Sequence, residues 1–395
     1  MEKRRTAIVG GGAAGFFLAI HLKEQCPQME VTILERASRV LRKVEVSGGG
    51  RCNVTNTFED IADLKEVYPR GHRLMGRLFR QFDHQAAWQW FEQRGVPLVA
   101  QADHCVFPRS QDAHSIINLF LAEVRRLGVV VRTGCSVSSL DDLADYDYVC
   151  VTTGGQPRRE GLLWLGQEVV EPVPSLFTLS ISDERLRALM GTVVERATAL
   201  IPATKFRASG PLLITHWGMS GPAILRLSSY AARHLAEVAY HSPLLVNWTE
   251  GVEADALQEI SLLMRQHPKR MLLSAAPLGL PSRLWGYLAE KALGQRALQA
   301  PWGSLNGREQ RRLAQTLIAD AYTISGRAPH SDEFVTCGGV ALSAVNPLTL
   351  ESRTRQGLFF AGEVLDVDGV TGGFNFQAAW TTAYAAACGI AMRER

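Results

Sequence analysis

The sequence predicts an α/β protein in which a parallel, doubly wound sheet is interrupted by an insertion. The chain begins with a strand, a glycine-rich turn, a helix and a second strand within residues 6–35. It ends with short apolar strands that run into glycines, followed by a long apolar helix. Strand-like and then helical segments lie between these ends, from about residue 192. We therefore expect a discontinuous nucleotide-binding domain with a second region inserted into it.

The first element contains G-x-G-x-x-G in the strand–turn–helix context that dinucleotide binding requires. The β-branched run Thr6–Val9 leads into Gly10, Gly12 and Gly15, and an apolar helix follows. The first glycine permits a tight turn, the second lets a pyrophosphate approach the backbone, and the third lets the helix pack on the strand. The second strand ends at Glu35, whose carboxylate can accept hydrogen bonds from a ribose diol. This segment predicts nucleotide binding.

Hydrophobic periodicity predicts the remaining elements in order. Helices are expected over 76–94 and 113–127, with strands over 129–132 and 148–152; the latter strand ends in Thr153-Gly154-Gly155. A strand that runs into small residues fits the carboxyl edge of a parallel sheet, where ligands bind. Further strands are expected over 193–200, 211–215, 243–248, 335–340 and 357–363, and helices within 253–322 (the last over 308–322) and over 376–392.

Composition and charge exclude several classes of protein. A net charge of +3 is too small to argue for nucleic-acid binding. No apolar run reaches the roughly 18 residues that span a bilayer, and glycines interrupt the place of a signal peptide, so we expect a cytoplasmic protein. Seven dispersed cysteines indicate reduced thiols rather than a disulfide framework. No His, Cys or carboxylate cluster has ligand spacing, so no metal is expected.

Three further glycine-rich segments point to the cofactor. Gly48–Gly50 lie between Ser47 and Arg51 and are interpreted as an anion cradle, in preference to a flexible loop. The strand after Gly357 ends at Glu363, an acid that could bind ribityl hydroxyls or could simply be solvated. Gly369–Gln377 enters the last helix, whose N-terminus could hold the anionic end of a reduced flavin. Two nucleotide-contacting segments near opposite ends of the chain favour tightly bound FAD over a nicotinamide cofactor alone.

These motifs resemble those of the BaiN/YhiN-like flavoproteins, NAD(P)/FAD-dependent oxidoreductases related to aminoacetone oxidase. The matching segments are collinear over nearly the whole chain: Gly10–Gly15, Ser47–Asn56, Thr153–Gly155, Leu213–Pro222, Thr336–Val340 and Gly357–Trp380. The resemblance implies a Rossmann-like FAD-binding domain built from both termini (1–190 and 336–395). It also implies an inserted β-barrel-like domain (191–252 and 323–335) and a helical subdomain (253–322).

The resemblance further implies that Glu35 binds the adenosine ribose, Glu363 the ribityl–phosphate region and residues 372–377 the isoalloxazine end. With the glycine segments, it gives the residues expected to bind the cofactor: Gly10, Gly12, Ala13, Ala14, Gly15, Glu35, Arg36, Lys43, Ser47, Gly49, Gly50, Arg51, Cys52, Asn53, Thr153, Gly154, Gly155, Gly362, Glu363, Gly372, Gly373, Phe374, Asn375 and Phe376.

The chain departs from this family after Gly155. Similar proteins carry a longer glycine-rich segment there, whereas this chain has Gln156–Arg159 and a short apolar run, Leu162–Leu165. The loss could open or reshape the region beside the flavin, so the family's substrate is not carried over.

No nucleophilic triad or carboxylate dyad is visible, and hydride transfer by a flavin needs none. His216 and Arg51 are the candidates for a catalytic role, as a proton donor and as a partner for negative charge on the reduced flavin. For His216 we favour a structural role in a glycine turn. Cys52 is expected to be a packed thiol rather than a redox centre.

We expect an FAD-dependent oxidoreductase that acts on a small organic molecule, with NAD(P)H or oxygen as its second redox partner. No second G-x-G-x-x-G follows a strand in the middle region, so NAD(P)H would bind only transiently. The alternative is a flavin-binding protein with an RNA-directed or partner-binding role. Basic pairs such as Lys269-Arg270 and Arg311-Arg312 leave that alternative open, although nucleic acid is the less expected partner.

Overall fold

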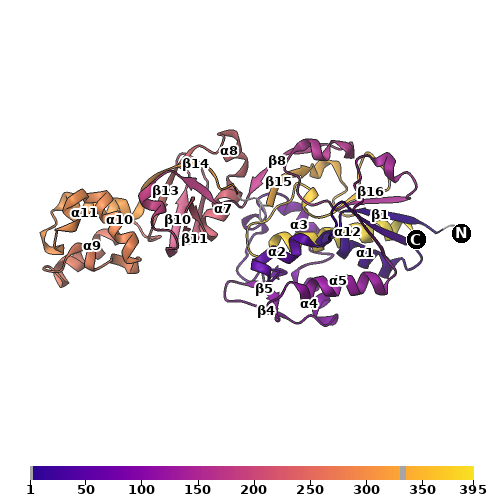
Figure 1. Ribbon diagram of the computed structural model, residues 1–395, viewed down its shortest axis with the longest axis horizontal. Helices are drawn as coiled ribbons and strands as arrows, with labels where there is room; N and C mark the ends of the chain where they lie inside the picture. The colour runs from indigo at the N-terminus through magenta and orange to yellow at the C-terminus, as the bar shows by residue number, and fades with distance from the viewer. Residues whose placement is uncertain (1–2, 330–334) are drawn as a thin grey trace. The chain divides into compact units, whose positions relative to one another are not determined.

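The computed structural model describes residues 3–329 and 335–395, which form two compact units (Figure 1). Unit 1 comprises Met1–Pro174 and Ser331–Arg395, and unit 2 comprises Ser175–His330. Unit 1 is thus built from both ends of the chain, and unit 2 is continuous in sequence. The expected barrel segment 323–335 includes residues 330–334, which lie outside the described residues.

The sheet of unit 1 has five parallel strands in the order β16-β7-β1-β2-β6. The central strands are almost wholly buried runs of aliphatic residues, as expected for a parallel sheet covered on both faces. All five strands point the same way, so their carboxyl ends lie along one edge. The strands are β1 (Arg5–Val9), β2 (Glu30–Glu35), β6 (Val130–Thr133), β7 (Tyr148–Val151) and β16 (Leu358–Phe360).

Two helices from opposite ends of the sequence pack together in unit 1 (Figure 1). They are α1 (Ala13–Gln25) and α12 (Phe374–Arg393), and both are buried on nearly every side. The ring of Phe17 on α1 lies 5.1 Å from that of Trp380 on α12. Phe120 on α5 (His114–Arg126) joins them, 5.7 Å from Trp380. This aromatic cluster fixes the start of α12 relative to the start of α1.

Smaller elements complete unit 1. The antiparallel sheet β3-β5-β4 consists of Thr55–Asn56, Cys105–Pro108 and Leu98–Ala100, and β8 (Val169–Ser175) pairs with β15 (Val335–Val340). The remaining helices are α2 (Arg42–Gly50), α3 (His72–Leu78) and α4 (His84–Gln93).

The prediction of one helix over 76–94 is wrong, because α3 ends at Leu78 and α4 begins at His84. Asp83 causes the new start: its side chain accepts the Ala86 N–H at 2.8 Å, as an N-cap does. We expect Asp83→Ala to lower the free energy of unfolding by about 1 kcal/mol. Urea titration measures this change, and Asp83→Ser, which keeps a capping oxygen, should restore most of it.

Unit 2 contains a closed six-stranded barrel in the order β10-β11-β12-β9-β14-β13. The barrel-like domain is predicted to begin at residue 191, but strand β9 of this barrel lies before that residue. The domain limits themselves stay a prediction. The strands are β9 (Leu179–Ile181), β10 (Val193–Leu200), β11 (Arg207–Ile214), β12 (Gly218–Ser220), β13 (Ser242–Asn247) and β14 (Asp320–Arg327), and short helices α6 (Glu184–Arg187), α7 (Pro222–Tyr230) and α8 (Ala232–Glu237) accompany them.

Three helices follow β13 in unit 2: α9 (Glu253–Gln266), α10 (Ser282–Leu293) and α11 (Gly307–Ile318). Trp285 and Trp302 stack in their core, with ring centroids 5.8 Å apart. The prediction that the last helix reaches Tyr322 is wrong, because Asp320 begins β14. Pairing of Tyr322 with Leu244 and a hydrogen bond from the Trp248 indole to Asp320 (3.1 Å) outweigh the local helical pattern.

None of the helices within residues 3–329 and 335–395 is long and apolar enough to cross a membrane. Across residues 3–329 and 335–395, no three His, Cys, Asp or Glu side chains are grouped so that they could hold a metal ion.

Candidate flavin site

The glycines of the first turn differ in what surrounds them. Gly10 has φ +115°, and a side chain there or at Gly15 would collide with backbone oxygen atoms, of Thr152 and of Gly10 respectively. A Cβ atom at Gly12 would meet nothing within 4 Å. The first and third glycines are thus required by close packing, whereas the second borders open space. That pattern is the one a pyrophosphate-binding turn needs.

The N-terminus of α1 carries unused hydrogen-bond donors. Its N-cap is Gly12, without a side-chain cap, and its first turn contains no acidic residue. Among the residues that the structure describes, nothing accepts from the N–H groups of Ala13, Ala14 and Gly15. Such N–H groups, at the positive end of a helix dipole, bind phosphate. These residues therefore fit the pyrophosphate of a dinucleotide.

Glu35 is held beside this turn at the end of β2. Its two carboxylate oxygens accept hydrogen bonds from the N–H groups of Gly11 and Ala37, each at 2.8 Å. Each oxygen keeps a second lone pair, so the carboxylate can still accept from a ribose diol. Arg36, predicted as a further contact, is exposed.

A second carboxylate, Glu363, lies where four chain segments meet. It accepts from the Lys43 ammonium at 2.8 Å and from the Thr336 N–H at 2.9 Å. A side chain at Gly155 would collide with both Glu363 and Thr336, so the backbone at Gly155 packs directly against these two side chains. The neighbouring Gly362 faces Ala14 at the start of α1, where an added Cβ would lie 2.9 Å from the alanine Cβ. The two predicted glycine–acid segments are thus brought together.

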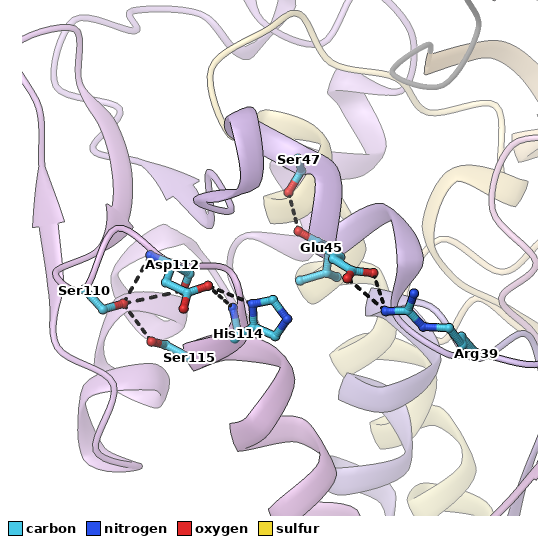
Figure 2. A network of polar contacts seen from close by, with 8 residues as sticks. Arg39, Glu45, Ser47, Ser110, Asp112, His114 and Ser115 are labelled. Carbon is cyan, nitrogen blue, oxygen red and sulfur yellow. Dashed lines mark hydrogen bonds and ion pairs between the residues drawn. The ribbon is translucent and has the colours of Figure 1, made fainter.

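The segment after Arg42 is helical up to Val46 and then changes conformation. Ser47 is extended, and Gly48, Gly49 and Gly50 have φ of 58°, 68° and 82°, the left-handed region that favours glycine. Figure 2 shows the contacts that precede the glycines: Arg39 binds Glu45 at 2.8 and 2.9 Å, and the Ser47 hydroxyl donates to the Val44 carbonyl at 2.9 Å.

The far end of this glycine segment is anchored at the start of α5. The Gly50 carbonyl accepts the Ala113 N–H at 2.9 Å. Just before Ala113, Asp112 accepts from the backbone N–H and the imidazole of His114, which lowers the pKa of Asp112 (Figure 2). A Cβ at Gly49 would meet nothing within 4 Å, so this glycine faces open space. The segment has a defined turn with an accessible backbone.

Arg51, Cys52 and Asn53 have different surroundings. The Arg51 guanidinium lies 4.2 Å from the centre of the Phe107 ring and donates to the Gly48 carbonyl at 3.0 Å. Cys52 is fully buried. The Asn53 amide bridges the Thr55 and Val106 carbonyls and the Gly373 N–H, in the orientation that satisfies all three. Asn53 thus connects the segment that follows Gly48–Gly50 to Gly373, at the start of α12.

Burial raises the pKa of the Cys52 thiol to about 12. The thiol is therefore protonated at neutral pH, and the thiolate that redox chemistry requires does not form. We expect Cys52 in the folded protein to resist alkylation by iodoacetamide between about pH 7 and 9 and to react after denaturation. Peptide mass spectrometry measures this, and the half-buried Cys26 and Cys105 provide internal comparisons. Rapid native labelling of Cys52 would contradict this assignment.

The glycines before α12 are fixed by side chains from the segment around β3. Gly373 has φ +89°, and a side chain there would collide with the Thr55 carbonyl. The Asn56 amide donates to the Gly372 carbonyl at 3.0 Å. The buried Tyr68 hydroxyl donates to the Phe374 carbonyl at 2.9 Å. This segment and the N-terminus of α12 are thereby placed firmly.

Asn375 and Phe376 lie inside the first turn of α12, which begins at Phe374, two residues before the predicted start at Phe376. The Asn375 amide bonds both the N–H and the carbonyl of Gly369, at 2.8 and 2.9 Å. The Phe376 ring stacks on Trp380, 5.5 Å between centroids. The Asn375 side chain thus shapes the turn before α12, while the half-buried Phe376 ring packs along the helix.

The predicted cofactor residues all belong to unit 1, whereas His216 lies in unit 2. His216 is exposed between β11 and β12, with its ring 5.0 Å from that of Trp217. Its catalytic role stays a prediction.

Two residues that support the site were not predicted from the sequence. They are Thr152, whose hydroxyl donates to the Gly10 carbonyl at 2.9 Å, and Tyr68. Thr152 directly precedes Thr153-Gly154-Gly155, a signal that could have found it; Tyr68 has no such signal.

The family described as HI0933-like protein Rossmann domain matches residues 4–389. The chain belongs to this family. The resemblance to BaiN/YhiN-like flavoproteins and the Rossmann-type FAD-binding fold are thereby confirmed. The HI0933-like chain is 27% identical over 421 residues to a 3-dehydro-bile acid delta(4,6)-reductase of Clostridium scindens, with 99% of each chain covered.

Ribosomal RNA dihydrouridine synthases of Haemophilus influenzae and Escherichia coli are 28% and 29% identical to this HI0933-like chain, with 98% of each chain covered. A solved structure of 3-ketosteroid delta1-dehydrogenase from Sterolibacterium denitrificans has a TM-score of 0.50 at 9% identity, covers 98% of this chain and 99% of its own, and shares the fold. These findings support the predicted enzyme class, a flavin-dependent oxidoreductase.

Proposed function

We propose that this HI0933-like protein uses FAD to reduce a carbon–carbon double bond conjugated to a carbonyl group in a small organic substrate. The observation that carries the FAD assignment is the convergence of the α1 N-terminus, Glu35 and Glu363 in one unit. The reaction type is supported by the relatives' names. A 3-dehydro-bile acid delta(4,6)-reductase and a dihydrouridine synthase both saturate a double bond in conjugation with a carbonyl.

Each part of the candidate site has a role toward FAD. The α1 N–H groups would bind the pyrophosphate, Glu35 the adenosine ribose, and Glu363 the ribityl chain after exchanging its bond to Lys43. The backbone of Gly372–Phe374, at the positive end of α12, would favour negative charge at the isoalloxazine end. FAD, when bound, supplies the hydride-transfer chemistry, and the protein supplies orientation and electrostatics.

Absorbance spectroscopy tests the proposal directly. We expect the purified protein to show oxidised-flavin bands that NADH or NADPH bleaches without oxygen, and a conjugated enone should then restore them. Bleaching by an amine or hydroxy compound instead would indicate an oxidase or dehydrogenase. A colourless protein that cannot be reconstituted with FAD would refute the proposal.

A further inference from the structure

We infer that two copies of this chain form a symmetric dimer through one face of the parallel sheet in unit 1. This face is the side of the sheet on which Ala7, Val9 and Leu34 lie, and it is called the thin face below. Two connections cover it: residues 134–147, between β6 and β7, and residues 156–168, between β7 and β8. The inference goes beyond the proposed function and does not depend on it.

The thin face is covered by short connections, whereas a parallel sheet normally carries α-helices on both faces. Ala7, Val9 and Leu34 pack against Leu143, which belongs to the 3-10 turn η2 (Leu140–Leu143). Trp164, on the 3-10 turn η3 (Arg159–Leu165), packs against the same cluster. Both connections consist of such turns and irregular backbone. They therefore form a thinner layer over the strands than a helix would.

This cover leaves apolar side chains partly exposed. Five of those that pack against the cluster are only partly buried: Cys135, Val137, Tyr146, Val149 and Trp164. Val130 and Arg132 of β6 lie on the same face, because Arg132 is paired in register with Leu34. Val130 is 48% exposed, and Leu163, directly before Trp164, is 57% exposed. Contiguous apolar surface of this kind marks a contact with another molecule.

A hollow of about 450 Å³ opens between η2 and the end of η3. Its lining includes Asp141, Trp164 and Arg355. The exposed Leu163 adjoins Trp164 and so lies close to the hollow. In a two-fold dimer both copies present the same patch, so a side chain beside the patch on one copy can fill a hollow on the other. We assign this role to Leu163.

The charges around the thin face identify a second copy as its occupant. Seven exposed charged side chains have no ion pair or side-chain hydrogen bond in the part of the chain that the structure describes: Arg132, Arg158, Arg159, Arg355, Asp141, Asp145 and Glu160. Both signs are thus present in nearly equal number. A surface with both signs complements a copy of itself, whereas nucleic acid or an anionic membrane would meet the acids.

The remaining charged groups of residues 134–147 already have partners. Asp142 accepts hydrogen bonds from two backbone N–H groups at the start of η2, and Asp147 pairs with Arg4 at 2.5 Å. The Arg5 guanidinium lies 5.0 Å from the centre of the Tyr146 ring. These groups therefore do not neutralise the unpaired charges.

The hollow gives the pairing across the dimer. Asp141 and Arg355 both line it, yet they form no ion pair with each other or with another described residue. In the dimer, Arg355 of one copy faces Asp141 of the other, and the two-fold axis repeats this pair. The interface thus combines Leu163 in the hollow with two symmetry-related ion pairs.

Sedimentation velocity of the purified 395-residue chain, over protein concentrations of about 1–100 µM, tests the inference. We expect a monomer–dimer equilibrium that approaches twice the chain mass at high concentration. Association should stop there, because a two-fold interface uses the thin face of both copies. A monomer throughout this range, or growth beyond the dimer, would overturn the inference.

Leu163→Asp should raise the Kd of the dimer at least about tenfold, because it brings a carboxylate to the apolar contact with Trp164. Leu348→Asp is the matched control: Leu348 is 56% exposed, and its neighbour Thr349 lies against Gly389 on α12. The control should change the Kd by less than about twofold. Equal effects of the two substitutions would contradict a dimer through the thin face.

Charge reversal tests the ion pairs. Asp141→Arg and Arg355→Asp each bring like charges together twice in a two-fold interface, and each should raise the Kd at least about tenfold. Asp141→Arg/Arg355→Asp restores opposite charges and the original net charge, and its Kd should return to within about threefold of the original. Circular dichroism checks that each variant is folded. A folded double variant that dimerises no better than the single variants would overturn the inference.

Discussion

Gly12→Asp should weaken FAD binding strongly without disturbing the fold. Gly12 has φ −94° and ψ −168°, a conformation open to any residue, and its Cβ position meets no atom within 4 Å. Aspartate is also a preferred N-cap, so the helix α1 should be stabilised by about a few tenths of a kcal/mol relative to glycine. The same carboxylate would take the N–H groups of the first turn and repel a pyrophosphate. We expect FAD affinity to fall at least about a hundredfold, close to 3 kcal/mol.

Gly12→Ala is the matched control, because it adds a methyl group to the same space without charge. It should retain most of the bound flavin. Flavin content after desalting and the melting temperature of the apoprotein measure the two effects separately. A Gly12→Asp protein that keeps stoichiometric FAD would show that the α1 N-terminus does not hold the phosphates. Loss of flavin together with a lowered melting temperature would instead point to misfolding.

Asp368→Ala should be strongly destabilising, by about 3–5 kcal/mol, because it removes the bidentate carboxylate partner of a buried arginine. The Asp368 side chain is fully buried, and its carboxylate forms a bidentate ion pair with Arg70, which is 11% exposed. Burial works against the charged Arg70, whereas the attraction of Asp368 raises the pKa of Arg70 and keeps it charged. Urea unfolding followed by circular dichroism measures the loss.

Arg39→Ala removes a partner of Glu45 from an exposed pair, with 69% and 30% of the two side chains accessible. Arg39→Ala should lower the free energy of unfolding by no more than about 1 kcal/mol. The double variant Arg70→Met/Asp368→Leu, which removes both charges, should recover most of the stability that Asp368→Ala loses. Similar costs for Asp368→Ala and Arg39→Ala would contradict the view that burial makes the Arg70–Asp368 pair sensitive.

The sequence predicts best those features that are encoded within one segment. The turn around Gly10 and Gly15 follows from the strand and helix on either side of it, and the parallel sheet follows from buried apolar runs. By contrast, the bond from the Thr336 N–H to Glu363 and the approach of Gly155 depend on how the strands are ordered, which local pattern does not contain. The family resemblance pointed to Glu363 and Gly155 as cofactor contacts, but it did not supply the geometry.

The errors have equally physical causes. Apolar periodicity runs through Asp83 without interruption, so only the capping bond distinguishes two helices from one. The strand β9 has three residues, too few for an alternating pattern, and it exists because β12 and β14 both pair with it. Tyr322 continues an apolar helical pattern in the sequence, but in the structure it lies in strand β14 of the barrel and pairs with Leu244. In each case a contact with a distant residue decides the local structure.

The pairing of β16 with β7 and the packing of α12 on α1 have a consequence for synthesis of the chain. Residues 5–35 emerge first from the ribosome and have their strand partners by residue 151, yet α1 lacks its partner α12 until residues 374–393 follow. Unit 2 is continuous and has its own partners much earlier. In limited proteolysis of chains arrested at different lengths, we expect the barrel of unit 2 to become protected before the segment around Gly10–Gly15. We therefore expect flavin to bind only after α12 has been made, and a chain that stops before residue 374 to bind none.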